Sequence, residues 1–412
     1  MNILITHPSF PGQYFYLSRY LAMNPENRVV FLSKENGIGG NLEGVQLGIY
    51  QKPREVSAET HGYLRAAEEA VLEGQQVLKA IYSLKEKGFV PDVIIGHAGW
   101  GSLMYIKDFY PDVPVIGYFE WYYHSVKSDS YWWPDEVPDI NAKLSIRTRN
   151  MHHLLSLDAC DIGITPTQWQ HDQFPQEYKS KIRIIHEGTD TAFCCPPEGD
   201  RPQMKIESVN LELPPGTEVI TYVSRGFELI RGFDKFMEAI RIVLKHRPNC
   251  HVVIAGNDKI FYGAQLADNK TFKQIEEEKG GYDKDRVHFV GSLNRGDYRK
   301  MLQASWCHVY LTRPFILSWS MLECMSFGLP MVCSATPPVM EVMEDGVNGL
   351  LAEFRSPSHI AKRILELMED RELAEKLGKA ARQTVLDRFE LNKCLKKMEN
   401  VIYEAVRVKR VR

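Results

Sequence analysis

Two arginines spaced six residues apart are the first candidates for chemistry. Arg225 and Arg231 lie in the segment Val223–Phe233, which follows an apolar β-branched run and precedes a stretch with helical periodicity. Guanidinium groups carry a fixed positive charge and forked hydrogen-bond donors, which a diphosphate requires. Gly226 and Gly232 beside them would let the backbone approach a ligand closely. The pair predicts a diphosphate site, whereas either arginine alone would be more simply explained as a solvated loop residue.

A second segment, Thr312–Pro330, combines an expected helix start with a carboxylate. We expect a strand to end at Thr312 and a helix to begin near Ser318, so that free backbone N–H groups and the helix dipole offer an anion site. Glu323 falls inside that helix among apolar neighbours, where a carboxylate usually has a partner. The partner could be a ribose diol, which can donate two hydrogen bonds, or a nearby arginine.

The N-terminal half has polar side chains where its expected strands end. His7 follows the run Ile3–Thr6, and Gly12 stands at the junction to the next helix, where backbone could reach a phosphate or sugar oxygen. His7 could bind an acceptor molecule or be structural. The segment is not G-x-G-x-x-G, so a nicotinamide site is not supported.

Two further segments could line the same edge of the sheet. Gly96–Gly101 places His97 and Trp100 after the run Val93–Ile95, where both side chains could form the wall of a cleft. Glu120 follows the run Val115–Tyr118 and could orient a sugar hydroxyl, act as a base, or form a structural ion pair.

Aromatic residues are concentrated just after Glu120. Trp121, Tyr122 and His124 are followed by Tyr131–Trp133, with polar and proline-rich sequence around them. Aromatic rings suit sugar stacking, because they combine apolar faces with polar edges. We expect this loop to cap a cleft and help to select the acceptor, and the alternative is a core or lid cluster.

The elements that must position these residues alternate regularly along the chain. Short β-branched runs are separated by stretches with helical periodicity, the pattern of βαβ units and parallel sheets. Proline-rich sequence over Asp190–Leu213 interrupts the pattern, which restarts at Val219–Val223. We predict an α/β fold of two Rossmann-like, doubly wound parallel-sheet domains, residues 1–190 and 191–390, with a final helix or tail over 391–412. Ligands should bind at the carboxyl ends of the strands.

Composition excludes several classes of protein. The 412 residues carry a formal net charge of −3, without the basic excess of a nucleic-acid binder, and 11% aromatic residues argue against disorder. The eight cysteines form no C-x-x-C pair, so we expect buried reduced thiols in a cytoplasmic protein. No metal is expected, because fixed cations would replace the ion.

These segments resemble the C-terminal domain of the retaining glycosyltransferases of family four, also called group one. Arg225 matches the first diphosphate-binding cation, Arg231 stands where the family commonly has lysine, and Glu323 matches a glutamate that holds the ribose. Ile185–Phe193 is similar to the segment that links the two domains in this family. The resemblance implies a GT-B fold, whose last helix crosses back onto the first domain. It also places Gly12 beside the donor phosphates, His97 and Trp100 on the acceptor side, and Glu120 where the family usually has histidine.

The same resemblance implies a nucleotide-diphosphate sugar as co-substrate, no other cofactor, transfer with retention, and a glycan, lipid-linked or small-molecule acceptor. Arg225 and Arg231 would then be catalytic through stabilisation of the leaving group, and Glu120 would act at the acceptor. A sugar-nucleotide 2-epimerase and a catalytically silent sugar-nucleotide binder are the alternatives.

One position departs from the family pattern. Phe315 stands where the family has its first glutamate, near the reacting carbon of the donor sugar. Three explanations stay open. Backbone N–H groups of Ile316, Leu317, Ser318 and Trp319 could suffice to bind the phosphate and sugar. The donor sugar could instead rest an apolar face or deoxy carbon on Phe315, or catalysis could be lost.

Basic residues form two further groups. Lys143, Arg147 and Arg149 lie close together, and the chain ends in the basic run Arg407–Arg412. Such groups could rest on anionic lipid at the inner face of a membrane, or they could be solvated surface.

Overall fold

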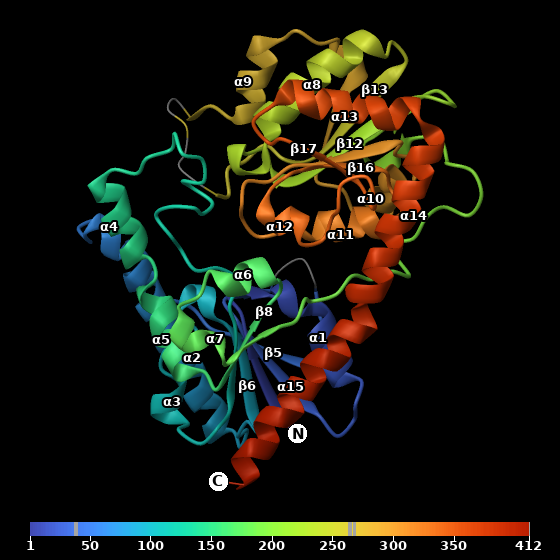
Figure 1. Ribbon diagram of the computed structural model, residues 1–412. Helices are drawn as coiled ribbons and strands as arrows, with labels where there is room; N and C mark the ends of the chain where they lie inside the picture. The colour runs from blue at the N-terminus through green and yellow to red at the C-terminus, as the bar shows by residue number, and fades with distance from the viewer. Residues whose placement is uncertain (37–39, 263–265, 267–268, 412) are drawn as a thin grey trace. The chain divides into compact units, whose positions relative to one another are not determined.

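The computed structural model describes residues 1–411 except 37–39, 263–265 and 267–268 (Figure 1). By internal contacts the chain divides into two compact units, one of Met1–Gly188 with Asn392–Arg412 and one of Thr189–Leu391. Each unit contains its own parallel sheet with helices packed against it, so the predicted α/β fold class is confirmed. Of the basic C-terminal run, the side chains of 408–412 lie outside the described residues.

The first unit is built on a seven-stranded sheet in the order β5-β3-β1-β6-β7-β8-β9, with every pair parallel. The strands are β1 (Asn2–Thr6), β3 (Arg28–Ser33), β5 (Val45–Ile49), β6 (Val93–His97), β7 (Val115–Tyr118), β8 (Ile162–Thr165) and β9 (Ile182–Ile184). The central strands β1 and β6 are almost wholly buried because helices cover both of their faces, which explains their continuous apolar sequences. Two short strands, β2 (Ser9–Phe10) and β4 (Glu35–Asn36), pair beside the sheet.

The helices of the first unit are α1 (Phe15–Ala22), α2 (Arg65–Glu86), α3 (Ile106–Phe109), α4 (Ile140–Thr148), α5 (Met151–Ala159), α6 (Gln168–Asp172) and α7 (Gln176–Lys179), with most of α15 (Leu391–Val411). Two contacts tie α15 to this unit. The Tyr20 hydroxyl donates to Glu399 at 3.1 Å, and Arg183 pairs with Glu404 at 3.4 Å.

The second unit is built on a six-stranded parallel sheet in the order β14-β13-β12-β15-β16-β17. The strands are β12 (Glu218–Gly226), β13 (Cys250–Asn257), β14 (Val287–Gly291), β15 (Cys307–Tyr310), β16 (Met331–Ser334) and β17 (Leu350–Ala352). The strand order reverses between β12 and β15, and such a switch point is where doubly wound folds bind ligands.

The helices of the second unit are α8 (Phe233–His246), α9 (Phe272–Lys279), α10 (Arg295–Gln303), α11 (Trp319–Ser326), α12 (Pro337–Met340), α13 (Pro357–Glu369) and α14 (Arg371–Arg388). In Figure 1, α8 and α13 lie over one face of the sheet and α11 and α12 over the other. A short antiparallel pair, β10 (Lys205–Ile206) and β11 (Leu211–Glu212), occupies the proline-rich segment.

All eight cysteines are free thiols, and seven of them are buried. Among the described residues, no helix is both long enough and apolar enough to span a bilayer.

The packing of α14 on the turn before β16 depends on a glycine pair. A Cβ atom at Gly378 would lie 2.2 Å from the carbonyl oxygen of Gly328. Alanine normally stabilises a helix interior relative to glycine, but here the added atom meets rigid backbone.

We therefore predict that Gly378→Ala lowers the free energy of unfolding by about 1–3 kcal/mol. Gly62→Ala is the matched control, because nothing lies within 4 Å of its added Cβ and its backbone is unstrained. Thermal unfolding of both variants measures the difference. A Gly378→Ala protein as stable as the wild type would contradict the packing described here.

Candidate functional site

Arg231 is a buried cation at the carboxyl edge of the second sheet. It ends the 3-10 turn Leu229–Arg231, which connects β12 to α8. Its Nη1 donates to the Tyr310 hydroxyl at 3.3 Å, to Thr312 Oγ1 at 2.9 Å and to the Ile316 carbonyl at 2.8 Å. Within the described chain, Arg231 forms no ion pair, and no acceptor is found for Nε or Nη2. A locked guanidinium without a carboxylate partner suits an anionic ligand.

Arg225 is held differently. It lies exposed at the end of β12, with its guanidinium carbon 4.2 Å from the centre of the Phe261 ring. The two glycines beside the arginines have packing roles, and their close approach to a ligand stays a prediction. A Cβ at Gly226 would lie 2.4 Å from the Lys259 carbonyl, and Gly232 has φ +64° with Leu311 Cβ 2.8 Å from its would-be Cβ.

Glu228, between the two arginines, was missed by sequence reasoning. Its Oε1 accepts hydrogen bonds from the backbone N–H groups of Phe261 and Tyr262, while its buried Oε2 has no hydrogen-bond partner among the described residues. Burial raises the pKa of Glu228, and the two backbone donors and both arginines oppose that shift only in part. The carboxylate thus fixes the loop whose rings lie against Arg225 and Arg231.

Phe315 is buried beside the cation, not exposed as a platform. Its ring centre lies 5.1 Å from that of Tyr262, edge to face, and 5.5 Å from the guanidinium carbon of Arg231. Tyr262 itself lies 6.0 Å from the same carbon. An apolar wall therefore occupies the position where the family has a glutamate.

The start of α11 is already engaged within the fold. The Ser318 N–H donates to the Tyr310 hydroxyl at 2.8 Å, and Ser318 Oγ lies 3.0 Å from Ser320 Oγ. Leu317 is buried, and the Ile316 carbonyl accepts from Arg231. The expected anion contacts of Ile316, Leu317 and Ser318 stay predictions. The Tyr310 hydroxyl accepts two hydrogen bonds, so its O–H remains available to donate a hydrogen bond to a ligand oxygen.

Glu323 has a tyrosine partner. Its Oε2 accepts from the buried Tyr298 hydroxyl at 2.7 Å. Arg295 is the arginine whose charge acts on Glu323, but its ion pair is with Asp190 at 3.6 Å. Burial raises the pKa of Glu323, against the hydrogen bond from Tyr298. No described donor reaches Oε1, which leaves one carboxylate oxygen for a ligand hydroxyl.

In the first unit, His7, His97 and Glu120 come together at the carboxyl edge of the sheet. His97 Nε2 lies 3.6 Å from Glu120 Oε2, and Gln13 Nε2 donates to Glu120 Oε1 at 3.4 Å. Burial acts to raise the pKa of Glu120, but pairing with His97, supported by Gln13 and His7, outweighs it and the pKa is lowered. Glu120 is therefore an ionised carboxylate that can accept a hydroxyl hydrogen bond.

His7 and Trp100 complete this group. The centre of the Trp100 ring lies 5.0 Å from that of His7 and 4.4 Å from that of His97. Gly12, with φ +51°, passes so close that a Cβ there would lie 2.6 Å from the His7 ring. The structure thus gives Gly12 a packing role, and its contact with a donor phosphate stays a prediction.

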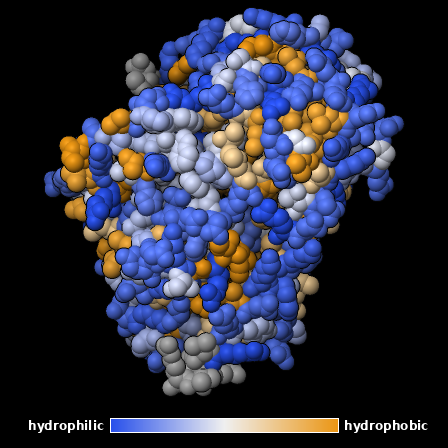
Figure 2. All heavy atoms as spheres, in the orientation of Figure 1, coloured by the Kyte–Doolittle hydropathy of each residue, from blue (hydrophilic) through white to orange (hydrophobic). Residues whose placement is uncertain are grey.

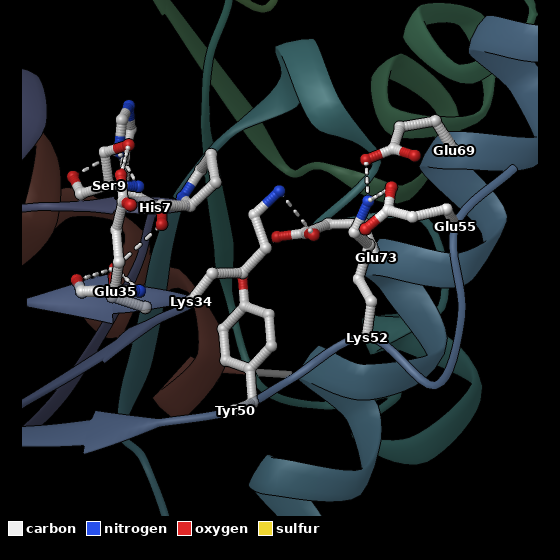
Figure 3. A network of polar contacts seen from close by, with 11 residues as sticks. His7, Ser9, Lys34, Glu35, Tyr50, Lys52, Glu55, Glu69 and Glu73 are labelled. Carbon is white, nitrogen blue, oxygen red and sulfur yellow. Dashed lines mark hydrogen bonds and ion pairs between the residues drawn. The ribbon is translucent and has the colours of Figure 1, made fainter.

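Sequence reasoning missed the polar network that fixes the loops after β1, β3 and β5 (Figure 3). Ser9 Oγ donates to Glu35 at 2.7 Å. The buried Glu73 carboxylate of α2 accepts from the Tyr50 hydroxyl and lies 3.3 Å from Lys34 Nζ. Contacts so far apart in sequence have no local pattern that could predict them.

The aromatic loop is mostly packing. Trp121 is 3% exposed, which agrees with the core alternative rather than with a stacking face. Tyr122 is half-buried against Phe174, with ring centres 5.8 Å apart, and His124 Nε2 contacts the Gln173 carbonyl at 2.7 Å. Only the outer edges of Tyr122 and His124 remain for an acceptor.

A second carboxylate at this edge was also missed. Tyr118, at the end of β7, donates its hydroxyl to Glu187 Oε1. Glu187 Oε2 is buried, 3.5 Å from His186 Nε2. Among the residues that the structure describes, no three His, Cys, Asp or Glu side chains are grouped to hold a metal ion.

Comparison with known families now adds to this geometry. Residues 25–194 match the model described as "Glycosyl transferase family 4 group", and residues 203–384 match "Glycosyl transferases group 1". The chain belongs to the group 1 glycosyltransferases. The two matches divide close to the boundary between the two units.

The relatives are distant. Spore coat protein SA of Bacillus subtilis (strain 168) is 27% identical over 222 residues, 53% of this chain and 57% of that protein. N-acetyl-alpha-D-glucosaminyl L-malate synthase of Bacillus anthracis is 27% identical over 123 residues, 30% of this chain and 32% of that protein. The similarity thus spans about half or less of these relatives' length.

Solved structures show the fold more completely. Sucrose-phosphate synthase from Thermosynechococcus elongatus superposes with a TM-score of 0.73 at 16% identity, covering 98% of both chains. Anabaena HepE in complex with UDP gives 0.71 at 17% identity, covering 98% of this chain and all of that one. These glycosyltransferases have the GT-B fold, which is the fold of this chain.

The buried histidines of the first unit predict a pH dependence. Burial lowers the pKa of His7 from 6.5 to about 3, repulsion by His97 adds to this, and the contacts with Ser9 and Glu120 oppose it. Burial likewise lowers the pKa of His152 to about 4. Below pH 6.5 these histidines therefore bind protons in the unfolded chain but stay neutral in the folded chain. The free energy of unfolding falls as the pH falls toward 4.

We predict that His7→Gln reduces the loss of stability between pH 7 and pH 5 by about 1.4–2 kcal/mol, because one proton-linked group is removed. Glu120 contributes little in this window, because its lowered pKa places its loss below pH 4.5. Calorimetry of the first unit's transition at both pH values measures the difference. An unchanged pH slope in His7→Gln would contradict a neutral buried His7.

Proposed function

We propose that this protein is a retaining glycosyltransferase that takes its sugar from a nucleotide-diphosphate sugar. The observation that carries the proposal is Arg231, a buried guanidinium held by three oxygens with donors left over. The acceptor class is a glycan, a lipid-linked molecule or a small molecule. Anabaena HepE, which shares the fold, was solved with UDP.

The donor would be held by the second unit. Arg225 and Arg231 contact the diphosphate, and the open Oε1 of Glu323 accepts from a ribose hydroxyl. Charge that develops on the departing diphosphate is neutralised by these fixed cations, and each charge-assisted contact is worth about 1.5–3 kcal/mol. No cofactor besides the nucleotide sugar enters this proposal.

Retention requires no protein nucleophile at Phe315. In an internal-return transfer, the bond from the anomeric carbon to the diphosphate oxygen breaks, and the acceptor oxygen bonds to the same face of that carbon. The departing diphosphate takes the acceptor proton. In the first unit, the ionised Glu120 with His97 would orient the acceptor hydroxyl. Because Phe315 is buried, it would contribute to an apolar wall near the donor sugar and would make little direct contact with it.

We predict that Arg231→Ala slows donor turnover by about tenfold or more, because a charge-assisted contact worth about 1.5–3 kcal/mol is lost in the transition state. Arg225→Ala should cost several-fold, because that guanidinium is exposed. Lys379→Ala is the charge-matched control, as its side chain is 82% exposed on α14. Turnover is followed by release of the nucleoside diphosphate from a panel of nucleotide sugars. Wild-type rates in both arginine variants would refute the site.

The stereochemistry separates this proposal from its alternatives. NMR of the product from the accepted donor should show the anomeric configuration of that donor. Inversion at C2 on an intact nucleotide sugar would indicate an epimerase. Binding without any turnover would indicate a catalytically silent binder. The replacement of the family's glutamate by Phe315 would then explain the loss of activity.

A separate prediction concerns Glu323. We predict that Glu323→Ala weakens the binding of a nucleoside diphosphate about tenfold and leaves the binding of inorganic pyrophosphate unchanged, because only the nucleotide has a ribose. Arg231→Ala should weaken both. Isothermal calorimetry with the two ligands measures the contrast. Equal losses for both ligands in Glu323→Ala would rule out the ribose contact.

A further inference from the structure

The outer face of α4 and α5 is apolar and exposed, and nothing in the proposed chemistry uses it. α4 buries none of its residues, and Ile140 and Leu144 on it are 70% and 49% exposed. α5 adds Met151 at 45%, Leu154 at 38% and Leu155 at 51%. We name these five side chains the apolar stripe. Isolated exposed apolar residues are ordinary, but a contiguous row of them usually marks an interaction site.

The stripe is continuous because α4 and α5 follow each other with almost no break in helical geometry. Arg149 and Asn150, which separate them, both have right-handed helical backbone angles. Backbone hydrogen bonds run from Arg149 N to the Ser145 carbonyl and from Leu154 N to the Asn150 carbonyl. At the helical rotation of about 100° per residue, the five side chains fall within an arc of about 100°. Figure 2 shows apolar surface gathered over α4.

The opposite face of α5 fixes which way the stripe points. His152 and His153 are buried there, and His152 Nε2 contacts the Gly99 carbonyl at 3.0 Å. Gly99 lies between His97 and Trp100, so α5 packs directly on the acceptor-side edge. The stripe cannot turn inward without unpacking that edge.

Cations outnumber acids on these helices. Between Ile140 and Ala159 the formally charged residues are Lys143, Arg147, Arg149 and Asp158. Lys143 and Arg147 are exposed; on the helical projection Lys143 lies just outside the arc of the stripe and Arg147 lies within it. Arg149 lies over the Tyr123 ring at 4.0 Å. Two acids stand at the ends. Asp139 accepts from Ala142 N as the helix cap, and the exposed Asp158 lies on the face of the stripe one turn beyond Leu154.

We propose that the apolar stripe is a docking surface for an anionic lipid bilayer. An exposed apolar row with three cations on the same helices and one acid at each end suits the boundary between anionic headgroups and acyl chains, where apolar side chains insert and Lys or Arg contact phosphate. This inference goes beyond the proposed function and does not rest on it.

The test is sedimentation of the full chain with vesicles of phosphatidylcholine, alone or with about one third phosphatidylglycerol. Partitioning should be at least about tenfold stronger on the anionic vesicles, since each cation near such a surface contributes about fivefold. The double variant Leu144→Gln with Met151→Gln should lower partitioning about tenfold or more. Lys143→Gln with Arg147→Gln should bring anionic vesicles to the level of neutral ones.

Met23→Gln is the matched control, because Met23 is 81% exposed on the same unit away from the stripe, and it should partition like the wild type. All substituted side chains are exposed, so unchanged melting curves should show that each variant folds. Absence of partitioning by the wild type, or equal loss in Met23→Gln, would overturn the proposal. So would stripe variants that change the oligomeric state, measured by light scattering, without changing vesicle binding.

Discussion

A buried guanidinium needs its donors satisfied, and this requirement shapes the carboxyl edge of the second sheet. Arg231 ends a turn after β12, and its Nη1 donates hydrogen bonds to oxygens of Tyr310, which ends β15, and of Thr312 and Ile316, which follow that strand. One side chain thus joins the two strands that flank the switch in strand order. Glu228 fixes the adjoining loop in a comparable way, through the backbone of Phe261. The result is a rigid edge with positive charge that no described carboxylate pairs, which is the preorganisation that stabilises a departing anion.

The matching edge of the first unit uses different chemistry. Buried His7 is kept neutral by desolvation, whereas Glu120 is kept ionised by His97. A neutral imidazole and an ionised carboxylate offer hydrogen-bonding groups without positive charge, which suits hydroxyl groups better than phosphates. The carboxyl edge of the second sheet thus carries a buried cation, whereas that of the first carries a carboxylate and imidazoles.

Much of the fold could be predicted because it depends on local pattern. Apolar β-branched runs predicted most of the strands, and the six-residue spacing of Arg225 and Arg231 predicted the arginine pair. Strand β5 (Val45–Ile49) was not predicted, because an edge strand with exposed positions has no continuous apolar run. Trp121 was expected near a ligand, yet burial decides such a position and composition does not reveal it. Glu228 and Glu187 were missed for a related reason: their hydrogen-bond partners lie 33 residues or more away in the sequence, so only the folded chain brings them together.

The central claim is that Arg225, Arg231 and Glu323 jointly receive a nucleoside diphosphate. A crystal structure of the protein with such a nucleotide tests it most directly. The account predicts phosphate oxygens within hydrogen-bond distance of both guanidinium groups and a ribose hydroxyl on Glu323 Oε1. A nucleotide ordered elsewhere on the chain, with Arg231 still donating only to Tyr310, Thr312 and Ile316, would contradict it.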